Sequence, residues 1–182
     1  MRAKLDQYPT PVFNGTQILQ AMHEDGLGLD EKHSLVLDPA SGRGNLLMAA
    51  KNVYPNVLVR GMEIDDVLAE DARIAGLDVT CQDALKSKGW DQPPWKTVVF
   101  MNPPYSHAME FVEAAVCGGF PTIALLRLSF LGSQSRAKFH NAYPSRVYVV
   151  KKRIKFVGNA TDNTDSAWFV WNMGKQGTWR IL

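Results

Sequence analysis

The sequence has 182 residues, of which 46% are hydrophobic and 21% are charged, with a formal net charge of +2. These values are ordinary for a globular domain and exclude a disordered or fibrous chain. No apolar run approaches the roughly 20 residues of a membrane helix. Residues 1–11 lack the apolar stretch of a signal peptide, so we expect a cytoplasmic protein.

Short apolar runs alternate with helix-like segments over most of the chain. This alternation predicts a parallel sheet with helices on both faces, and it places ligands at the carboxyl ends of the strands. The runs that are typical of strands are 34–38, 57–63, 78–82, 97–101 and 122–128. The segments between them that fit helices are 45–52, 65–75 and 107–116.

The C-terminal part has a different pattern. Two β-rich runs, 146–151 and 167–173, are joined by a turn-like loop without a helical segment, which predicts an antiparallel hairpin at one edge of the sheet. We expect an α/β fold of the Rossmann-like type, with a mostly parallel seven-stranded sheet. Residues 1–182 are predicted to form a single domain.

A glycine-rich turn follows the first predicted strand, in Asp38-Pro-Ala-Ser-Gly-Arg-Gly-Asn45. Glycines at positions 42 and 44 allow a tight turn and a close approach of a ligand to the backbone. The next helix directs free N–H groups toward such a ligand. The turn is not the dinucleotide fingerprint, because Leu47 stands where that motif has its third glycine.

Acidic residues stand at or just after the ends of three successive predicted strands: Asp38, Glu63 and Asp83. Carboxyl ends of neighbouring parallel strands share one edge of a sheet, so these carboxylates are expected to line one crevice. An acidic crevice disfavours a pyrophosphate and favours a cationic nucleoside.

The fourth predicted strand runs into Asn102-Pro103-Pro104-Tyr105. Together with the glycine turn, this motif resembles class I S-adenosylmethionine-dependent methyltransferases that methylate amines, whose catalytic motif is (D/N/S)PP(Y/F). Residues 8–11 are similar to the segment that closes over the methionine end of the cofactor in N6-adenine DNA methyltransferases. The chain is most similar to the compact, bacteriophage-type members, which implies the cytoplasm of a bacterium, or of a host if the protein is phage-encoded.

The resemblance implies S-adenosyl-L-methionine as the cofactor, held at its methionine end by Asp38 and the turn. Glu63 would bind the ribose, Asp83 the adenine amine, and Ile64 the adenine ring. The implied cofactor-binding residues are Thr10, Pro11, Asp38, Pro39, Ala40, Gly42, Gly44, Asn45, Glu63, Ile64, Asp83, Ala84 and Asn102.

The implied catalytic residues are Asn102, Pro103, Pro104 and Tyr105, and their chemistry has an independent physical basis. The exocyclic amine of adenine is a weak nucleophile because its lone pair is delocalised into the ring. The Asn102 side-chain carbonyl and the Pro103 backbone carbonyl can each accept one amine hydrogen. Tyr105 offers a face on which the base stacks, a contact worth roughly 1–3 kcal/mol. No metal is required.

The segment between Glu113 and Asp162 contains no acidic residue. Its cations predict phosphate contacts with DNA, or with RNA, and a base in a duplex would have to be flipped out to reach the site. The predicted nucleic-acid-binding residues are Arg136, Lys138, Lys151, Lys152, Arg153 and Lys155.

N6-methylation of adenine in DNA is the leading hypothesis. The alternatives are methylation of base amines in RNA, N5-methylation of a protein glutamine, and a nucleic-acid-binding module with a relic cofactor pocket. Few residues follow the fifth predicted strand, so the sequence shows no separate target-recognition domain and leaves the target site and the oligomeric state open.

Overall fold

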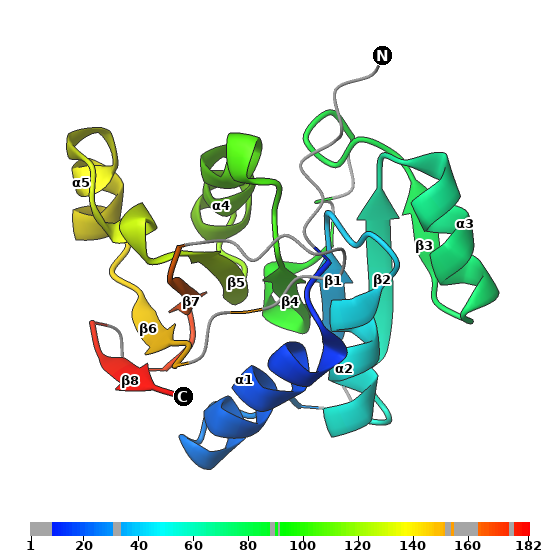
Figure 1. Ribbon diagram of the computed structural model, residues 1–182, viewed down its shortest axis with the longest axis horizontal. Helices are drawn as coiled ribbons and strands as arrows, with labels where there is room; N and C mark the ends of the chain where they lie inside the picture. Colours follow the sequence, from blue (N-terminus) through cyan, green and yellow to red (C-terminus); the bar gives the residue numbers. More distant parts are fainter. Residues whose placement is uncertain are drawn as a thin grey trace.

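The computed structural model describes residues 9–30, 34–87, 90, 92–151, 154, 164–174 and 177–182. Within this part of the chain, the strands form one eight-stranded sheet in the order β3-β2-β1-β4-β5-β7-β6-β8 (Figure 1). The strands are β1 (Leu35–Asp38), β2 (Leu58–Glu63), β3 (Val79–Cys81), β4 (Thr97–Met101), β5 (Thr122–Arg127), β6 (Arg146–Val149), β7 (Ser166–Trp171) and β8 (Trp179–Ile181).

The strand directions confirm a mostly parallel α/β sheet. Strands β1 to β5 pair in parallel, and β7 is inserted antiparallel between β5 and β6. The predicted pair of C-terminal strands is therefore correct, but the predicted number of seven strands is wrong. Strand β8 pairs in parallel with β6 and forms the edge in place of the hairpin.

Apolar side chains explain why the central strands lie where they do. All residues of β4 are buried, and so are all residues of β7. A strand with helices on both faces buries both sets of its side chains, so its sequence reads as a continuous apolar run. Trp168 of β7 packs against Phe100 of β4 on the same face of the sheet, over the intervening β5, with ring centroids 5.4 Å apart.

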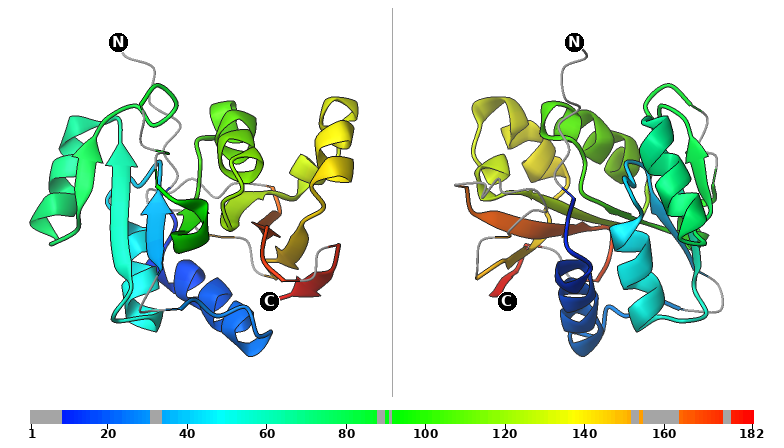
Figure 2. Two further views of the ribbon diagram at one scale, coloured as in Figure 1. Left: turned by 180° about the vertical axis from the view of Figure 1, so that it is seen from behind. Right: turned by 45° about the vertical axis from the view of Figure 1, so that its right-hand side comes forward.

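Helices cover both faces of the sheet (Figure 2). The buried side chains form two hydrophobic clusters. Side chains of α1, α2 and α3 belong to one cluster, and side chains of α4 and α5 belong to the other. The α-helices are α1 (Val12–Glu24), α2 (Asn45–Val53), α3 (Asp66–Ile74), α4 (Ala108–Cys117) and α5 (Gln134–Ala142). Among the described residues, no helix has the length and apolar character needed to cross a membrane.

Local sequence fixes where the helices near the strand ends begin. The carboxylate of Asp65 accepts hydrogen bonds from the backbone N–H groups of Val67 and Leu68 at the start of α3. Before α4, Pro103 and Pro104 cannot donate backbone hydrogen bonds, and a short 3-10 turn, η2 (Tyr105–His107), precedes the helix. Both starts lie beside the carboxyl ends of their preceding strands.

Helix α1 lies unusually close to α2. Gly15 of α1 faces Ala49 of α2, and a Cβ atom added at Gly15 would stand 2.8 Å from the Cβ of Ala49 and 3.0 Å from Leu46 Cδ2. Only a residue without a side chain permits this approach. The contact holds α1 against α2, and residues 9–11 lead directly into α1.

We predict that Gly15→Leu lowers the free energy of unfolding by about 1–3 kcal/mol, because the side chain overpacks the contact between α1 and α2. Urea unfolding measures the change. Gln20→Leu is the matched control, because Gln20 is exposed on the same helix. Equal stability of the two variants would show that the close approach is not required.

Candidate active site

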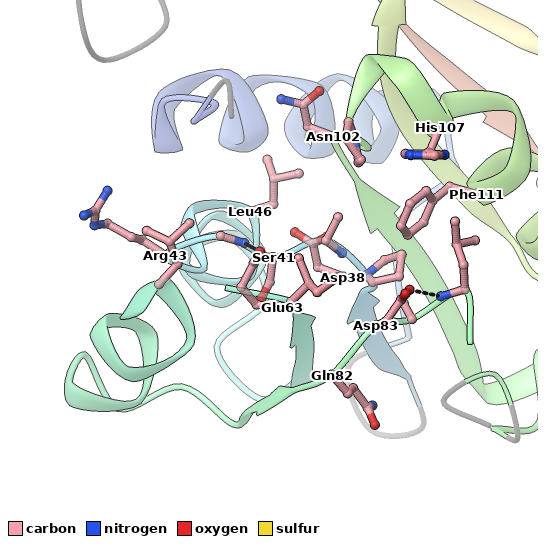
Figure 3. A pocket seen from close by; sticks show the side chains of 18 of the residues that line it. Asp38, Ser41, Arg43, Leu46, Glu63, Gln82, Asp83, Asn102, His107 and Phe111 are labelled. Atoms are coloured by element: carbon pink, nitrogen blue, oxygen red, sulfur yellow. Dashed lines mark hydrogen bonds between the residues drawn. The ribbon is translucent and has the colours of Figure 1, made fainter. Parts of the chain in front are cut away.

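A cavity of about 730 Å³ opens at the carboxyl ends of β1 to β4 (Figure 3). Figure 3 shows Asp38, Glu63, Asp83 and Asn102 around this one space, each following or ending a different strand. Since the four strands are parallel neighbours, their ends meet at one edge of the sheet. The crevice expected from the three acidic strand ends is present, and Asn102 lies in it with them.

The glycine turn after β1 has a backbone that other residues could not adopt easily. Gly44, which precedes α2, has φ +80°, and a Cβ atom there would clash with the side chain of Leu77. The turn is tied to the neighbouring strand, because Gly42 N donates to Glu63 Oε2 over 2.7 Å. Glu63 Oε1 accepts from Asp65 N over 2.9 Å. These two bonds fix the carboxylate of Glu63 at the rim of the turn.

Asp38 is the most deeply buried carboxyl group of the cavity wall. Its Oδ1 accepts a hydrogen bond from Ala40 N over 3.1 Å, but burial dominates and raises its pKa from 3.8 to about 8, with a further contribution from Glu63. Asp38 therefore keeps its proton to a higher pH than an exposed carboxyl group does. The expectation of an acidic crevice did not include this effect of burial.

Asp83 has a different environment. A hydrogen bond from the Lys86 ammonium group is the main cause that lowers its pKa, and the Leu85 N–H adds to the effect. The Lys86 Nζ to Asp83 Oδ2 distance is 3.0 Å. Arg43, also on the cavity wall, is paired with Asp71 over 2.9 Å. The cavity thus contains cations as well as carboxylates, with Arg43 and Lys86 each held in an ion pair.

Thr10 joins the N-terminal segment to the cavity. Its backbone oxygen accepts from Asn45 Nδ2 over 2.8 Å, and its hydroxyl oxygen accepts from Asn102 Nδ2 over 3.0 Å. The second bond uses the NH2 group of the Asn102 side chain. The carbonyl oxygen of that side chain, Oδ1, is therefore the atom that can accept a hydrogen bond from a ligand.

Most of the sequence-predicted site residues lie together. Those on the cavity wall are Thr10, Asp38, Pro39, Ala40, Gly42, Asn45, Glu63, Ile64, Asp83, Ala84, Asn102 and Pro104. Pro11 and Gly44 are outside the wall and precede α1 and α2. Pro103 is buried, and Tyr105 lies outside the wall with its ring next to Arg127.

The cavity wall also has Pro9, from the segment 8–11 that was expected to close over the cofactor. Its residues that were not predicted are Ser41, Arg43, Leu46, Leu68, Gln82, Leu85, Lys86, Ser106, His107 and Phe111. The apolar ones resemble ordinary core residues in the sequence, so no signal distinguished them. Ser41 lies within the recognised glycine turn. Its Oγ is buried without a hydrogen-bond partner among the described residues, which makes it available to a polar ligand.

The predicted nucleic-acid-binding residues fall into three groups. Lys138 and Lys151 are exposed. Arg136 is turned onto its own loop, where its guanidinium donates to the backbone oxygens of Ser129, Phe130 and Gly132. Lys152, Arg153 and Lys155 lie outside the described residues. Over the part of the chain that is described, no group of three His, Cys, Asp or Glu residues could hold a metal ion.

Comparison with known proteins gives a likeness in structure but not in sequence. Neither a family model nor a curated protein matches the sequence. The 23S rRNA methyltransferase ErmE is 18% identical, with a TM-score of 0.67 over 93% of this chain and 71% of that one. A SAM-dependent O-methyltransferase from Thermotoga maritima is 14% identical, with a TM-score of 0.60 over 97% of this chain and 70% of that one.

An RNA methyltransferase from Salinibacter ruber, solved in complex with S-adenosyl-L-homocysteine, is 16% identical, with a TM-score of 0.55 over 93% of this chain and 96% of that one. At such identities the likeness establishes the fold alone. The chain therefore has the Rossmann-like fold of these methyltransferases, as the arrangement of its strands predicted.

We predict that Asp38→Asn changes how stability depends on pH. The folded-state pKa of Asp38, about 8, lies above the ordinary value of 3.8, so the contribution of this group to stability is lost as the pH rises between these values. The introduced asparagine does not titrate, so the stability of the variant relative to the wild type should rise as the pH increases from about 5 to about 8.

Urea unfolding of the ligand-free protein at several pH values measures this difference. Asp78→Asn, which removes an exposed carboxylate, is the control and should not show the same trend. A difference between Asp38→Asn and the wild type that stays constant over this range would contradict the assignment.

Proposed function

We propose that the protein transfers a methyl group from S-adenosyl-L-methionine to the exocyclic N6 amine of adenine in DNA. The observation that carries the proposal is the single cavity that contains the glycine turn, the acidic ends of β2 and β3, and the acceptor side chain of Asn102. We further propose that residues 1–182 act as one methyltransferase domain.

The cavity has suitable size and chemistry for the cofactor. Its volume of about 730 Å³ falls within the range of roughly 300–1,000 Å³ that is usual for small-molecule sites. Asp38 is suited to a cationic group, because a nearby positive charge favours its ionised form. Glu63 has its carboxylate fixed at the rim and can still accept from ribose hydroxyls through its remaining lone pairs.

The cofactor, when bound, supplies an electrophilic methyl group on a positively charged sulfur. Asn102 Oδ1 and the Pro103 backbone oxygen accept the two hydrogens of the target amine, which directs the nitrogen lone pair out of the base plane. Thr10 keeps the Asn102 amide in the required orientation. The contribution of these residues is positioning and electrostatic stabilisation, without a covalent intermediate on the protein.

The choice of substrate rests on the Asn-Pro-Pro-Tyr motif and on the cations that follow Glu113. The motif favours an amine on a planar base, and exposed Lys138 and Lys151 can contact phosphates. Adenine in RNA is the second candidate, because ErmE and the Salinibacter ruber enzyme act on RNA according to their names. Flipping a base out of a duplex costs a few kcal/mol, and a single strand avoids this cost. The candidate substrates therefore include single-stranded DNA and RNA.

The proposal is tested by incubating the protein with methyl-labelled S-adenosyl-L-methionine and separate pools of DNA, RNA and protein. Nucleoside analysis then identifies the labelled product. We expect labelled N6-methyladenine from the DNA pool. Label in RNA alone would select the second candidate, and label in protein alone would exclude both.

Asn102 variants supply the matched controls. Asn102→Ala removes the acceptor and should lower kcat by about 10²–10³, as loss of a transition-state hydrogen bond does in other enzymes. Its affinity for the cofactor, measured by calorimetry, should fall much less than kcat does. Asn102→Asp retains an acceptor oxygen and should retain part of the activity. Normal turnover by Asn102→Ala would show that the role assigned to Asn102 is wrong.

A further inference from the structure

His107 is a titratable side chain of the cavity wall to which the proposed function gives no role. It lies on the wall together with Asn102, and both belong to the segment that joins β4 to α4. In Figure 3 these two side chains lie in the upper part of the cavity, and Glu63 and Asp83 lie in the lower part. His107 is therefore carried by the same strand end as the acceptor for the target amine.

The side chain of His107 does not serve to start the helix. His107 is the residue that precedes α4, but its side chain makes no capping hydrogen bond. Its Nδ1 instead lies 2.6 Å from Oε2 of Glu110, which is in the first turn of α4. An ionised carboxylate can only accept, so Nδ1 carries the hydrogen of this bond. The other ring nitrogen, Nε2, then has a lone pair in the neutral imidazole.

The proposed reaction releases one proton. As the amine nitrogen forms its bond to the methyl carbon, the carbon–sulfur bond breaks and its electron pair stays on the sulfur. The nitrogen then carries the methyl group, two hydrogens and a positive charge, and it becomes neutral by losing one hydrogen as a proton. The oxygens of Asn102 and Pro103 can accept hydrogen bonds, but amide oxygens are too weakly basic to keep a proton near neutral pH. The proton therefore needs another acceptor.

The other bases of the cavity wall belong to the strand ends that are assigned to the cofactor. The charged or titratable side chains that share the wall with His107 are Asp38, Arg43, Glu63, Asp83 and Lys86. Both oxygens of Glu63 accept from backbone N–H groups, and the carboxylate of Asp83 is paired with Lys86. Asp38 is buried at the end of β1. The side chain of His107 is 56% exposed, so a proton that it takes up can pass on to water.

We propose that Nε2 of His107 takes the proton from the target amine during methyl transfer, directly or through one water molecule. The inference rests on the proposed function and adds to it a catalytic residue, His107, and a positioning residue, Glu110. The carboxylate of Glu110 keeps the hydrogen of the neutral ring on Nδ1 and stabilises the imidazolium that forms. The imidazolium then releases its proton to the solvent.

The first test measures the rate constant of a single turnover for His107→Ala with the cofactor and an adenine-containing oligonucleotide. Loss of a general base should lower this constant by about 10²-fold. Added imidazole should restore part of the rate, because neutral imidazole can enter the space of the missing ring and accept the proton. Asn102→Ala is the control, and its rate should not respond to imidazole. Cofactor affinity close to that of the wild type shows that His107→Ala is folded.

The second test uses Glu110→Gln, in which the side chain no longer fixes the tautomer of the ring. NMR of nitrogen-15-labelled histidine reads the tautomer without any reaction. In the wild type we expect the hydrogen of the neutral His107 ring on Nδ1, and in Glu110→Gln a mixture of the two tautomers. The single-turnover rate constant should fall less than in His107→Ala. Glu113→Gln changes an exposed glutamate of the same helix and should alter neither quantity.

The outcomes distinguish this inference from the proposed function. Wild-type protein that methylates neither DNA nor RNA overturns both. If the wild type methylates a nucleic acid but His107→Ala keeps the wild-type rate constant, or is slow and is not rescued by imidazole, only the role of His107 is overturned. A neutral His107 ring with its hydrogen on Nε2 in the wild type also overturns this inference alone.

Discussion

Buried Thr10 joins three distant parts of the chain at the candidate site. Its backbone oxygen is bonded to Asn45 at the start of α2, and its hydroxyl oxygen is bonded to Asn102 after β4. The segment that carries Thr10 is held in turn by the packing of Gly15 against Ala49. If this connection is broken, the acceptor side chain and the glycine turn are no longer fixed relative to one another.

The parallel sheet supplies the other condition for the site. Strands β1 to β4 end at one edge, so residues that are far apart in the sequence surround one cavity. Their surroundings then give similar side chains different properties. Burial raises the pKa of Asp38, whereas the Lys86 ammonium group lowers the pKa of Asp83. A cation bound near Asp38 would favour its ionised form, and the carboxylate of Asp83 can accept a hydrogen bond from a neutral amine.

Much of the fold could be predicted because the buried strands are continuous apolar runs. The limits predicted for β4 are those observed, and the limits of β1, β2, β3 and β5 differ from the prediction by at most one residue at either end. Helix α5 was missed because Phe139 is its only buried residue. Strand β8 was missed because all of its residues are exposed, which leaves no pattern of burial in the sequence.

The site was predictable to the extent that it depends on short motifs. The glycine turn, the acidic strand ends and Asn102 could be located because each follows a recognisable strand. The raised pKa of Asp38 could not be predicted, because it depends on how deeply the side chain is buried. The contact between Arg127 and Tyr105 could not be predicted either, because these residues meet only in the folded sheet. Helix α1 was not predicted either, and its close contact with α2 at Gly15 joins segments that meet only in the folded protein.

We propose that one cavity places a sulfur-bound methyl group next to an acceptor for an amine. A crystal structure of the protein with S-adenosyl-L-homocysteine tests this arrangement. We expect the ribose hydroxyls within hydrogen-bond distance of Glu63, and the sulfur directed toward Asn102. A ligand bound elsewhere, or one whose sulfur points away from Asn102, would contradict it.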